Sequence, residues 1–226
     1  RLENMKQYDQ ATQAQERVGV FGYATDTAIL TGTLPVAPEL AFEAWHDAGT
    51  PDDFSDDVLI ATVDRVAIEE IGRVDGLEVR SAEVKFDDLG VSYWREALYS
   101  NGERIHYGEP GLPNETTHVE QPEVTTQATS DVVVKSEFTD TATITGLIEE
   151  GTKLAFNAYQ EVRAGDQKVG DRGELLWHDN GAAMIWTQTE IDELGEAVCT
   201  AQPIWNLGLV DVPAGDHEGL TIESAP

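Results

Sequence analysis

The chain has 226 residues, of which 40% are hydrophobic, and it carries a formal net charge of −29 at pH 7. This length and hydrophobic content fit one or two domains with ordinary cores. Such an acidic chain repels nucleic acid and anionic lipid, so we expect neither as a partner. No apolar run is long enough to cross a membrane, so we expect no membrane insertion in this segment.

The first stretch, residues 1–11, is polar and charged, which predicts a leader or linker. The chain starts at Arg1, and no signal peptide is visible. We therefore expect an excised or processed piece of a longer protein.

From Thr12 onward, one segment occurs twice. Residues 12–45 align without a gap with residues 126–159, at an offset of 114 positions. The shared strings are Thr12-Gln13-Ala14 with Thr126-Gln127-Ala128, Thr25-Asp26-Thr27-Ala28 with Thr139-Asp140-Thr141-Ala142, and Leu40-Ala41-Phe42 with Leu154-Ala155-Phe156. Such a period indicates tandem modules, here residues 12–122 and 123–226.

Each copy opens with strand patterns. β-Branched residues alternate with small ones in 140–146, and an apolar, aromatic-rich run follows at 154–159. Copy one continues with strand candidates at 58–63, 77–84, 91–99, 104–107 and 115–119. Asn101-Gly102 marks a tight hairpin turn. We expect Phe42, Trp94 and Phe156 to be core anchors.

Copy two contains an insertion, at about residues 160–200. The string at 219–225 matches 76–82 at an offset of 143, which is larger than the offset of the first segment. Within the insertion, Thr187 or Thr189 can cap a short helix whose apolar face holds Ile191, Leu194 and Val198. Copy two also has no counterpart of residues 84–119, so its last strands are expected to come from outside this chain.

These strings resemble immunoglobulin-like repeats of actinobacterial cell-wall-anchored proteins, a family of surface and pilus-like proteins. The resemblance rests on the D-T-A-x-I-x-G string from Asp140, on Gly90–Leu98, and on Asn114-Glu115-Thr116-Thr117. Ser92 departs from the aromatic residue that the family has there. The resemblance implies an all-β fold of two tandem immunoglobulin-like β-sandwich domains, the second with a short helical insertion and without its C-terminal strands.

The resemblance also bears on the one cysteine, Cys199, which has no partner within the chain. The family has a cysteine at this place in the insertion and a second one before the closing strand. Cys199 is therefore a disulfide candidate with a partner outside the chain. A free thiol is the alternative.

The sequence indicates no enzyme and no cofactor. It contains no G-x-S-x-G, H-E-x-x-H, Walker or G-x-G-x-x-G motif. None of its five histidines lies at metal-ligand spacing from another His or from Cys199. Four acids of one loop are weak calcium candidates, namely Asp52, Asp53, Asp56 and Asp57. Their spacing does not match an EF-hand, and a solvated acidic loop explains them as well.

Two further sites stay open. Thr12 or Thr126 in a first strand, with Gln121 after a last strand, has the residue types of a Thr–Gln ester cross-link. Trp177, Trp186 and Trp205 lie in or beside the insertion, where they suit either a core or a sugar platform. An ordinary hydrogen-bonded threonine is the alternative for the first site.

Together these features predict a non-enzymatic stalk or adhesin segment of a large modular bacterial surface protein, extracellular and wall-anchored through regions outside this chain. Its expected partners are other repeats of the same protein or neighbouring chains, and a host or cell-surface ligand. Two alternatives remain: a module that binds carbohydrate or protein, and a structural surface-layer or virion subunit of a halophile, which would account for the acidity.

Overall fold

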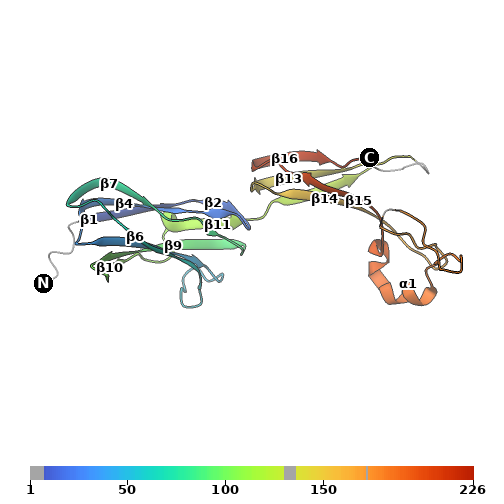
Figure 1. The fold of residues 1–226 in the computed structure, drawn as a ribbon, viewed down its shortest axis with the longest axis horizontal. Helices are drawn as coiled ribbons and strands as arrows, with labels where there is room; N and C mark the ends of the chain where they lie inside the picture. Colours follow the sequence, from blue (N-terminus) through green and yellow to red (C-terminus); the bar gives the residue numbers. More distant parts are fainter. Residues whose placement is uncertain (1–7, 130–135, 172) are drawn as a thin grey trace. The chain divides into compact units, whose positions relative to one another are not determined.

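The computed structural model describes residues 8–129, 136–171 and 173–226. The chain divides into two compact units, residues 1–123 and 124–226, which are called unit 1 and unit 2. Both are built predominantly of β-strands (Figure 1). In the described residues, no helix has the length and apolar character needed to span a membrane.

Unit 1 contains two main sheets. The first has the order β1-β4-β7, and the second has the order β2-β11-β9-β5-β6, with β10 added to β9. The strands are β1 (Tyr8–Ala14), β2 (Arg17–Gly19), β3 (Tyr23–Ala24), β4 (Asp26–Thr33), β5 (Pro38–His46), β6 (Val58–Ala67), β7 (Arg73–Arg80), β8 (Val84–Lys85), β9 (Gly90–Ser100), β10 (Glu103–Tyr107) and β11 (Thr116–Glu120). A short 3-10 helix at Pro113–Glu115 precedes β11.

Two sequence predictions need correction in unit 1. The leader predicted for residues 1–11 is wrong over Tyr8–Ala11, because these residues begin β1 and pair with β4. The single strand expected over residues 77–84 is two strands, since β7 ends at Arg80 and β8 starts at Val84.

The core of unit 1 lies between the two main sheets. Residues of β4 alternate between buried and half-buried positions, and β5 and β9 turn large apolar side chains to the same core. Phe42 and Trp94 have no exposed surface, and the Trp94 ring meets Phe86 edge-on at a centroid distance of 5.9 Å. The Trp94 indole N–H donates to Thr117 Oγ1 at 3.1 Å, which satisfies its one polar atom.

The second strand of unit 1 and its last strand meet in a parallel pair. β2 lies parallel to β11, with Val18 opposite Val119. The Arg17 guanidinium donates to both carboxylate oxygens of Glu120, at 2.9 Å from Nε and 2.7 Å from Nη2. Backbone hydrogen bonds from Val20 to Glu120 and from His118 to Glu16 extend this pair. We call β2, β11 and these contacts the terminal clamp.

Unit 2 also contains two sheets, β12-β13-β16 and β14-β15. Its strands are β12 (Glu123–Ala128), β13 (Asp140–Ile148), β14 (Lys153–Gln160), β15 (Gln202–Asp211) and β16 (Gly215–Glu223). Its hydrophobic cluster consists of Ile144, Ile148 and Val212, against which half-buried residues of β14 and β16 pack, namely Leu154, Leu220 and Ile222.

The strand pairing of unit 2 repeats that of unit 1 residue by residue. Ala28 lies opposite Val79, and their counterparts Ala142 and Ile222 lie opposite each other. The register shifts between Leu30 and Gly32 in β4 and at the equivalent place in β13. The β14–β15 pair repeats β5–β6, with Leu154 opposite Val210 as Leu40 is opposite Val66. Both units therefore follow one structural plan.

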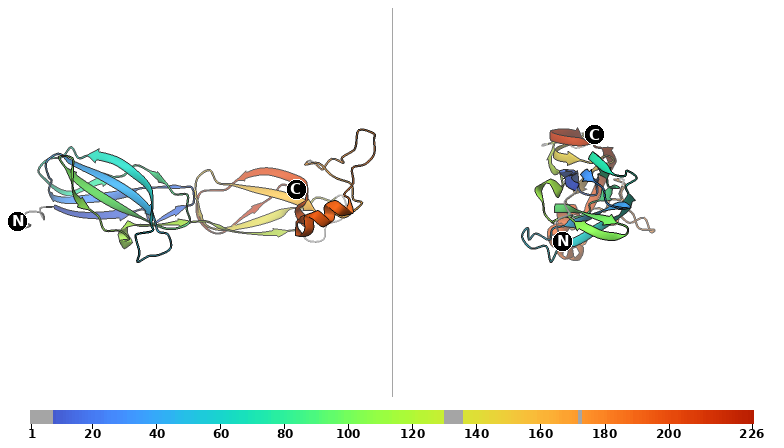
Figure 2. Two further views of the ribbon diagram at one scale, coloured as in Figure 1. Left: turned by 90° about the horizontal axis from the view of Figure 1, so that it is seen from below. Right: turned by 90° about the vertical axis from the view of Figure 1, so that its left-hand side faces the viewer.

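The segment between β14 and β15 carries the insertion (Figure 2). Isolated bridges such as Gln167 to Ile185 tie its arms, and helix α1 (Gln188–Leu194) follows. Of the two cap candidates from the sequence, Thr187 caps this helix, and it forms a capping box with Glu190. The helix ends at Leu194, earlier than the sequence pattern indicates, because the chain continues as a 3-10 turn at Gly195–Thr200.

Candidate functional site

The acidic loop of unit 1 uses its carboxylates for local hydrogen bonds. Asp53 Oδ1 accepts from the Ser55 backbone and hydroxyl, and Asp56 accepts from Thr50 Oγ1. Asp57 Oδ2 accepts from the Tyr93 hydroxyl at 2.6 Å. Within the described residues, no three acids of this loop bring ligand atoms within 4.8 Å of one another. The loop geometry thus favours a folded turn over the calcium site.

The other sequence candidates lie apart from one another. Cys199 is a free, exposed thiol in the 3-10 turn of the insertion. Phe156, the counterpart of Phe42, is 5% exposed. Thr12 lies in the β1-β4-β7 sheet, whereas Gln121 follows β11 of the other sheet. The side chains of Thr12 and Trp205 lie outside the described residues.

The insertion carries a row of exposed apolar side chains. Leu175, Trp177 and Ile185 are about half exposed on its bridged arms. Trp186 is half-buried, with Lys168 Nζ 4.6 Å from its ring centroid. Lys168 also donates to Glu190, and this contact, together with the cap at Thr187, lowers the pKa of Glu190 to about 2. These contacts hold α1 against the arms.

A carboxyl cluster, which we define as Asp26, Glu96 and Glu115, lies in the interior of unit 1. The three side chains come from β4, β9 and the 3-10 helix before β11, and ligand atoms of all three lie within 4.8 Å of one another. None is more than 3% exposed. In the described part of the chain, no other set of three His, Cys, Asp or Glu residues meets this criterion.

Few donors reach this cluster. The Thr27 backbone N–H donates to Asp26 Oδ1 at 2.8 Å, and the Asn114 amide donates to Glu115 Oε1 at 3.1 Å. One oxygen of each carboxyl group, Asp26 Oδ2, Glu96 Oε1 and Glu115 Oε2, is buried without a donor if the three groups are ionised. A proton on one carboxyl group lets it donate to its neighbour and removes this cost.

Burial and mutual repulsion oppose ionisation of the cluster. Burial, together with contact with Glu96, raises the pKa of Asp26 to about 9. Burial first, and then the neighbouring carboxyl groups, raise the pKa values of Glu96 and Glu115 to about 8. Like charges this close cannot all ionise in a desolvated site. The cluster therefore holds protons at neutral pH.

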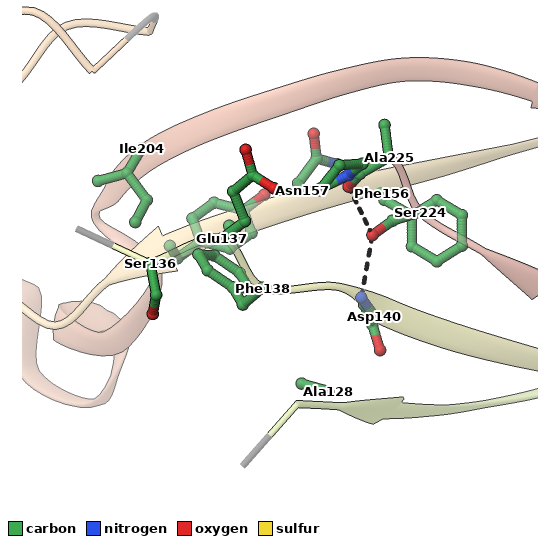
Figure 3. Close-up of a pocket in the computed structure, with 13 residues that line it drawn as sticks. Ala128, Ser136, Glu137, Phe138, Asp140, Phe156, Asn157, Ile204, Ser224 and Ala225 are labelled. Carbon is green, nitrogen blue, oxygen red and sulfur yellow. Dashed lines mark hydrogen bonds between the residues drawn. The ribbon is translucent and has the colours of Figure 1, made fainter. Parts of the chain in front are cut away.

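Unit 2 has an open groove where unit 1 has this cluster and Trp94. A cavity of about 550 Å³ lies between β13, β14 and β16 (Figure 3). It is lined by Ala128, Ser136, Glu137, Phe138, Asp140, Phe156, Asn157, Ala158, Tyr159, Ile204, Ser224, Ala225 and Pro226. Asp140 is the counterpart of Asp26, and its buried Oδ1 forms no hydrogen bond with any residue that the structure describes.

The sequence did not reveal the carboxyl cluster. Its three members lie in separate segments, and acids are too frequent in this chain for any pair to be informative. One local signal was present. Glu96 alternates with Trp94 and Leu98, so it occupies a core-facing position of β9.

No protein-family model matches the chain. The search of curated proteins also found no match. The function is therefore argued from the repeat, the terminal clamp and the geometry of the two units.

Proposed function

We propose that the chain is a non-enzymatic stalk or adhesin segment of a modular bacterial cell-surface protein, made of tandem immunoglobulin-like modules. The main support is the repeated register, in which β13–β16 reproduces β4–β7 down to the shift before Gly32 and Gly146. Tandem modules of one plan provide length and repeated surfaces, whereas catalysis requires a single pocket. The sequence resemblance to wall-anchored repeats points in the same direction.

The terminal clamp of unit 1 supports a mechanical role. Because β2 and β11 are parallel, force that reaches them from the two ends of the unit, through β1 on the N-terminal side, pulls them in opposite directions along the strand axis. The hydrogen bonds between them are then loaded together, and one bond cannot open before the next. The Arg17–Glu120 ion pair bridges the same two strands at 2.7 Å. This arrangement resists shear.

Single-molecule stretching of the whole chain tests this proposal. We expect unit 1 to unfold at a higher force than unit 2, since the described residues of unit 2 form no such parallel pair. Arg17→Ala should lower the unfolding force of unit 1. Lys85→Ala is the matched control, because it removes an exposed ion pair to Asp87 outside the clamp. Equal unfolding forces for the parent chain and Arg17→Ala would contradict a clamp that resists force.

A second candidate function, recognition of a carbohydrate or protein ligand, is favoured by the exposed Leu175, Trp177 and Ile185. Aromatic and aliphatic side chains grouped on a projecting segment are typical of binding surfaces. Binding of the chain to a glycan array or to cells, lost in Trp177→Ala and kept in Tyr23→Ala on unit 1, would favour this alternative. Tyr23 is similarly exposed, at 55% against 56% for Trp177.

A further inference from the structure

We propose that the groove of unit 2 is an acceptor site for an extended β-strand that has the Trp-x-Glu pattern of β9 in unit 1. This inference rests on the proposed function, because it takes the pattern of the incoming strand from the module plan that the two units share. In unit 1 the corresponding strand is β9, with Trp94 and Glu96 two positions apart.

The first argument is an open strand edge. In unit 1, β5 is paired on both sides, with β6 on one edge and β9 on the other. In unit 2, β14 pairs with β15, which is the counterpart of β6. No described strand pairs with the other edge of β14. An edge of this kind offers a row of backbone donors and acceptors to an incoming strand.

The second argument is the identity of the lining residues. The groove is lined by Asp140, Phe156, Ala158 and Ser224, whose counterparts in unit 1 are Asp26, Phe42, Ala44 and Ser81. All four counterparts are buried in unit 1. The hydrogen bonds of Ser81 with Asp26 are repeated by Ser224 with Asp140, at the same 2.9 Å from the Asp N–H to the Ser hydroxyl. The groove is thus lined by the counterparts of residues that are buried in unit 1.

The pairing in unit 1 gives the register of the missing strand. Trp94 lies opposite Ala44, and Glu96 lies opposite Phe42. Residues directly opposite in an antiparallel pair turn their side chains to the same face. An incoming strand in this register places its Trp opposite Ala158 and its Glu opposite Phe156, both of which line the groove.

A buried oxygen atom in the groove favours an incoming strand that carries a Glu. Asp140 Oδ1 is buried, and no described residue forms a hydrogen bond with it. In unit 1 the equivalent carboxyl group of Asp26 lies against Glu96. A protonated Glu on the incoming strand can donate to Asp140 Oδ1 in the same manner. The site therefore selects for both the aromatic ring and the acid, not only for an apolar strand.

A synthetic peptide with the sequence of residues 88–107, which spans β9 and β10, tests the proposal on the full 226-residue chain. We expect saturable binding by fluorescence anisotropy, and hydrogen-exchange protection of β14 amides when the peptide is bound. A Trp94→Ser peptide should bind about 30-fold more weakly, as for removal of a buried hot-spot residue. A Tyr99→Ser peptide is the matched control, because Tyr99 lies on the other face of β9, under Arg65.

Variants of the chain give a second measurement. Ala158→Trp should fill the groove and abolish peptide binding, whereas Ala155→Trp on the exposed face of β14 should leave it unchanged. The proposal is overturned if the parent peptide does not bind, or if the parent and Trp94→Ser peptides bind equally. It is also overturned if the chain alone forms a dimer in which the β14 amides are already protected, since a second copy then closes the edge. Stretching of unit 1 tests the stalk proposal separately from all these outcomes.

Discussion

The carboxyl cluster makes the stability of unit 1 fall as pH rises, and this prediction can be worked out from the structure. In the unfolded chain, the pKa of Asp26 returns from about 9 to 3.8 and those of Glu96 and Glu115 from about 8 to 4.5. The folded state therefore holds protons that the unfolded state has released. Stability is complete below about pH 4 and is lost progressively as pH rises to between 8 and 9.

The slope follows from the number of protons held. Each proton bound only by the folded state lowers the free energy of unfolding by about 1.4 kcal/mol per pH unit. One such proton gives a loss of about 3 kcal/mol between pH 5 and pH 7. Three would give about 8 kcal/mol, which approaches the whole stability of a typical domain. We expect the free energy of unfolding to fall between pH 5 and pH 7 by at least the amount for one proton. This corresponds to a fall of more than about 10 °C in melting temperature.

The assay is thermal unfolding of the whole chain at pH values between 5 and 9, monitored by the near-ultraviolet circular dichroism of the tryptophans. Glu96→Gln should flatten the pH dependence by about one proton, because the amide keeps the shape of the side chain and cannot ionise. Glu78→Gln is the same substitution at an exposed position of β7 and should leave the slope unchanged. Equal slopes for Glu96→Gln and the parent chain would refute proton storage by the cluster. A large stabilisation by millimolar calcium at pH 8, absent in Glu96→Gln, would show instead that the three carboxylates bind a cation.

Three further predictions concern other parts of the chain. Trp94→Ala should destabilise unit 1 by about 3–5 kcal/mol, whereas Trp177→Ala, which is 56% exposed, should change stability by less than about 0.5 kcal/mol, both measured by urea unfolding. Thr187→Ala removes the capping box of α1 and should cost about 1 kcal/mol, seen as faster hydrogen exchange of the first helical amides with no change in unit 1. If the net charge of −29 belongs to a cell-wall protein that is not adapted to high salt, the chain should stay folded in dilute buffer. Unfolding when the salt concentration falls below the molar range would favour the halophile alternative.

The sequence predicted those features that depend on local patterns. Alternation placed β9 within one residue at each end, and Asn101-Gly102 forms the turn to β10 with positive φ at both residues. The cap of α1 was also predictable, since Thr187 and Glu190 have capping-box spacing. The early end of α1 was not, because Gly195 follows Leu194 with a positive φ that stops the α-helix while the apolar pattern continues.

Features that depend on distant segments could not be predicted in the same way. The terminal clamp joins Arg17 to Glu120, and the carboxyl cluster joins β4 to β9 and to the residue before β11. The contacts form only when the two sheets pack, and no local period encodes them. The repeat supplied one indirect signal, since aligning the two copies shows which strand of unit 1 has no counterpart within residues 124–226.

The two copies of the Thr-Asp-Thr-Ala string connect the cluster with the groove. Burying an Asp at the start of β4 costs free energy unless a second carboxyl group shares its proton in a hydrogen bond. In unit 1, β9 and the helix before β11 bring Glu96 and Glu115 to Asp26. In unit 2 the same Asp140, bonded to the same serine hydroxyl, keeps one buried oxygen without a partner. Asp140 is thus placed for a carboxyl group that the described part of unit 2 does not provide, and the strand that brings the Trp to Ala158 would bring that carboxyl group with it. On this argument, Asp140→Leu should weaken binding of the parent peptide yet leave binding of a Glu96→Leu peptide intact. If Asp140→Leu changes the affinity for both peptides equally, Asp140 does not recognise the Glu of the incoming strand.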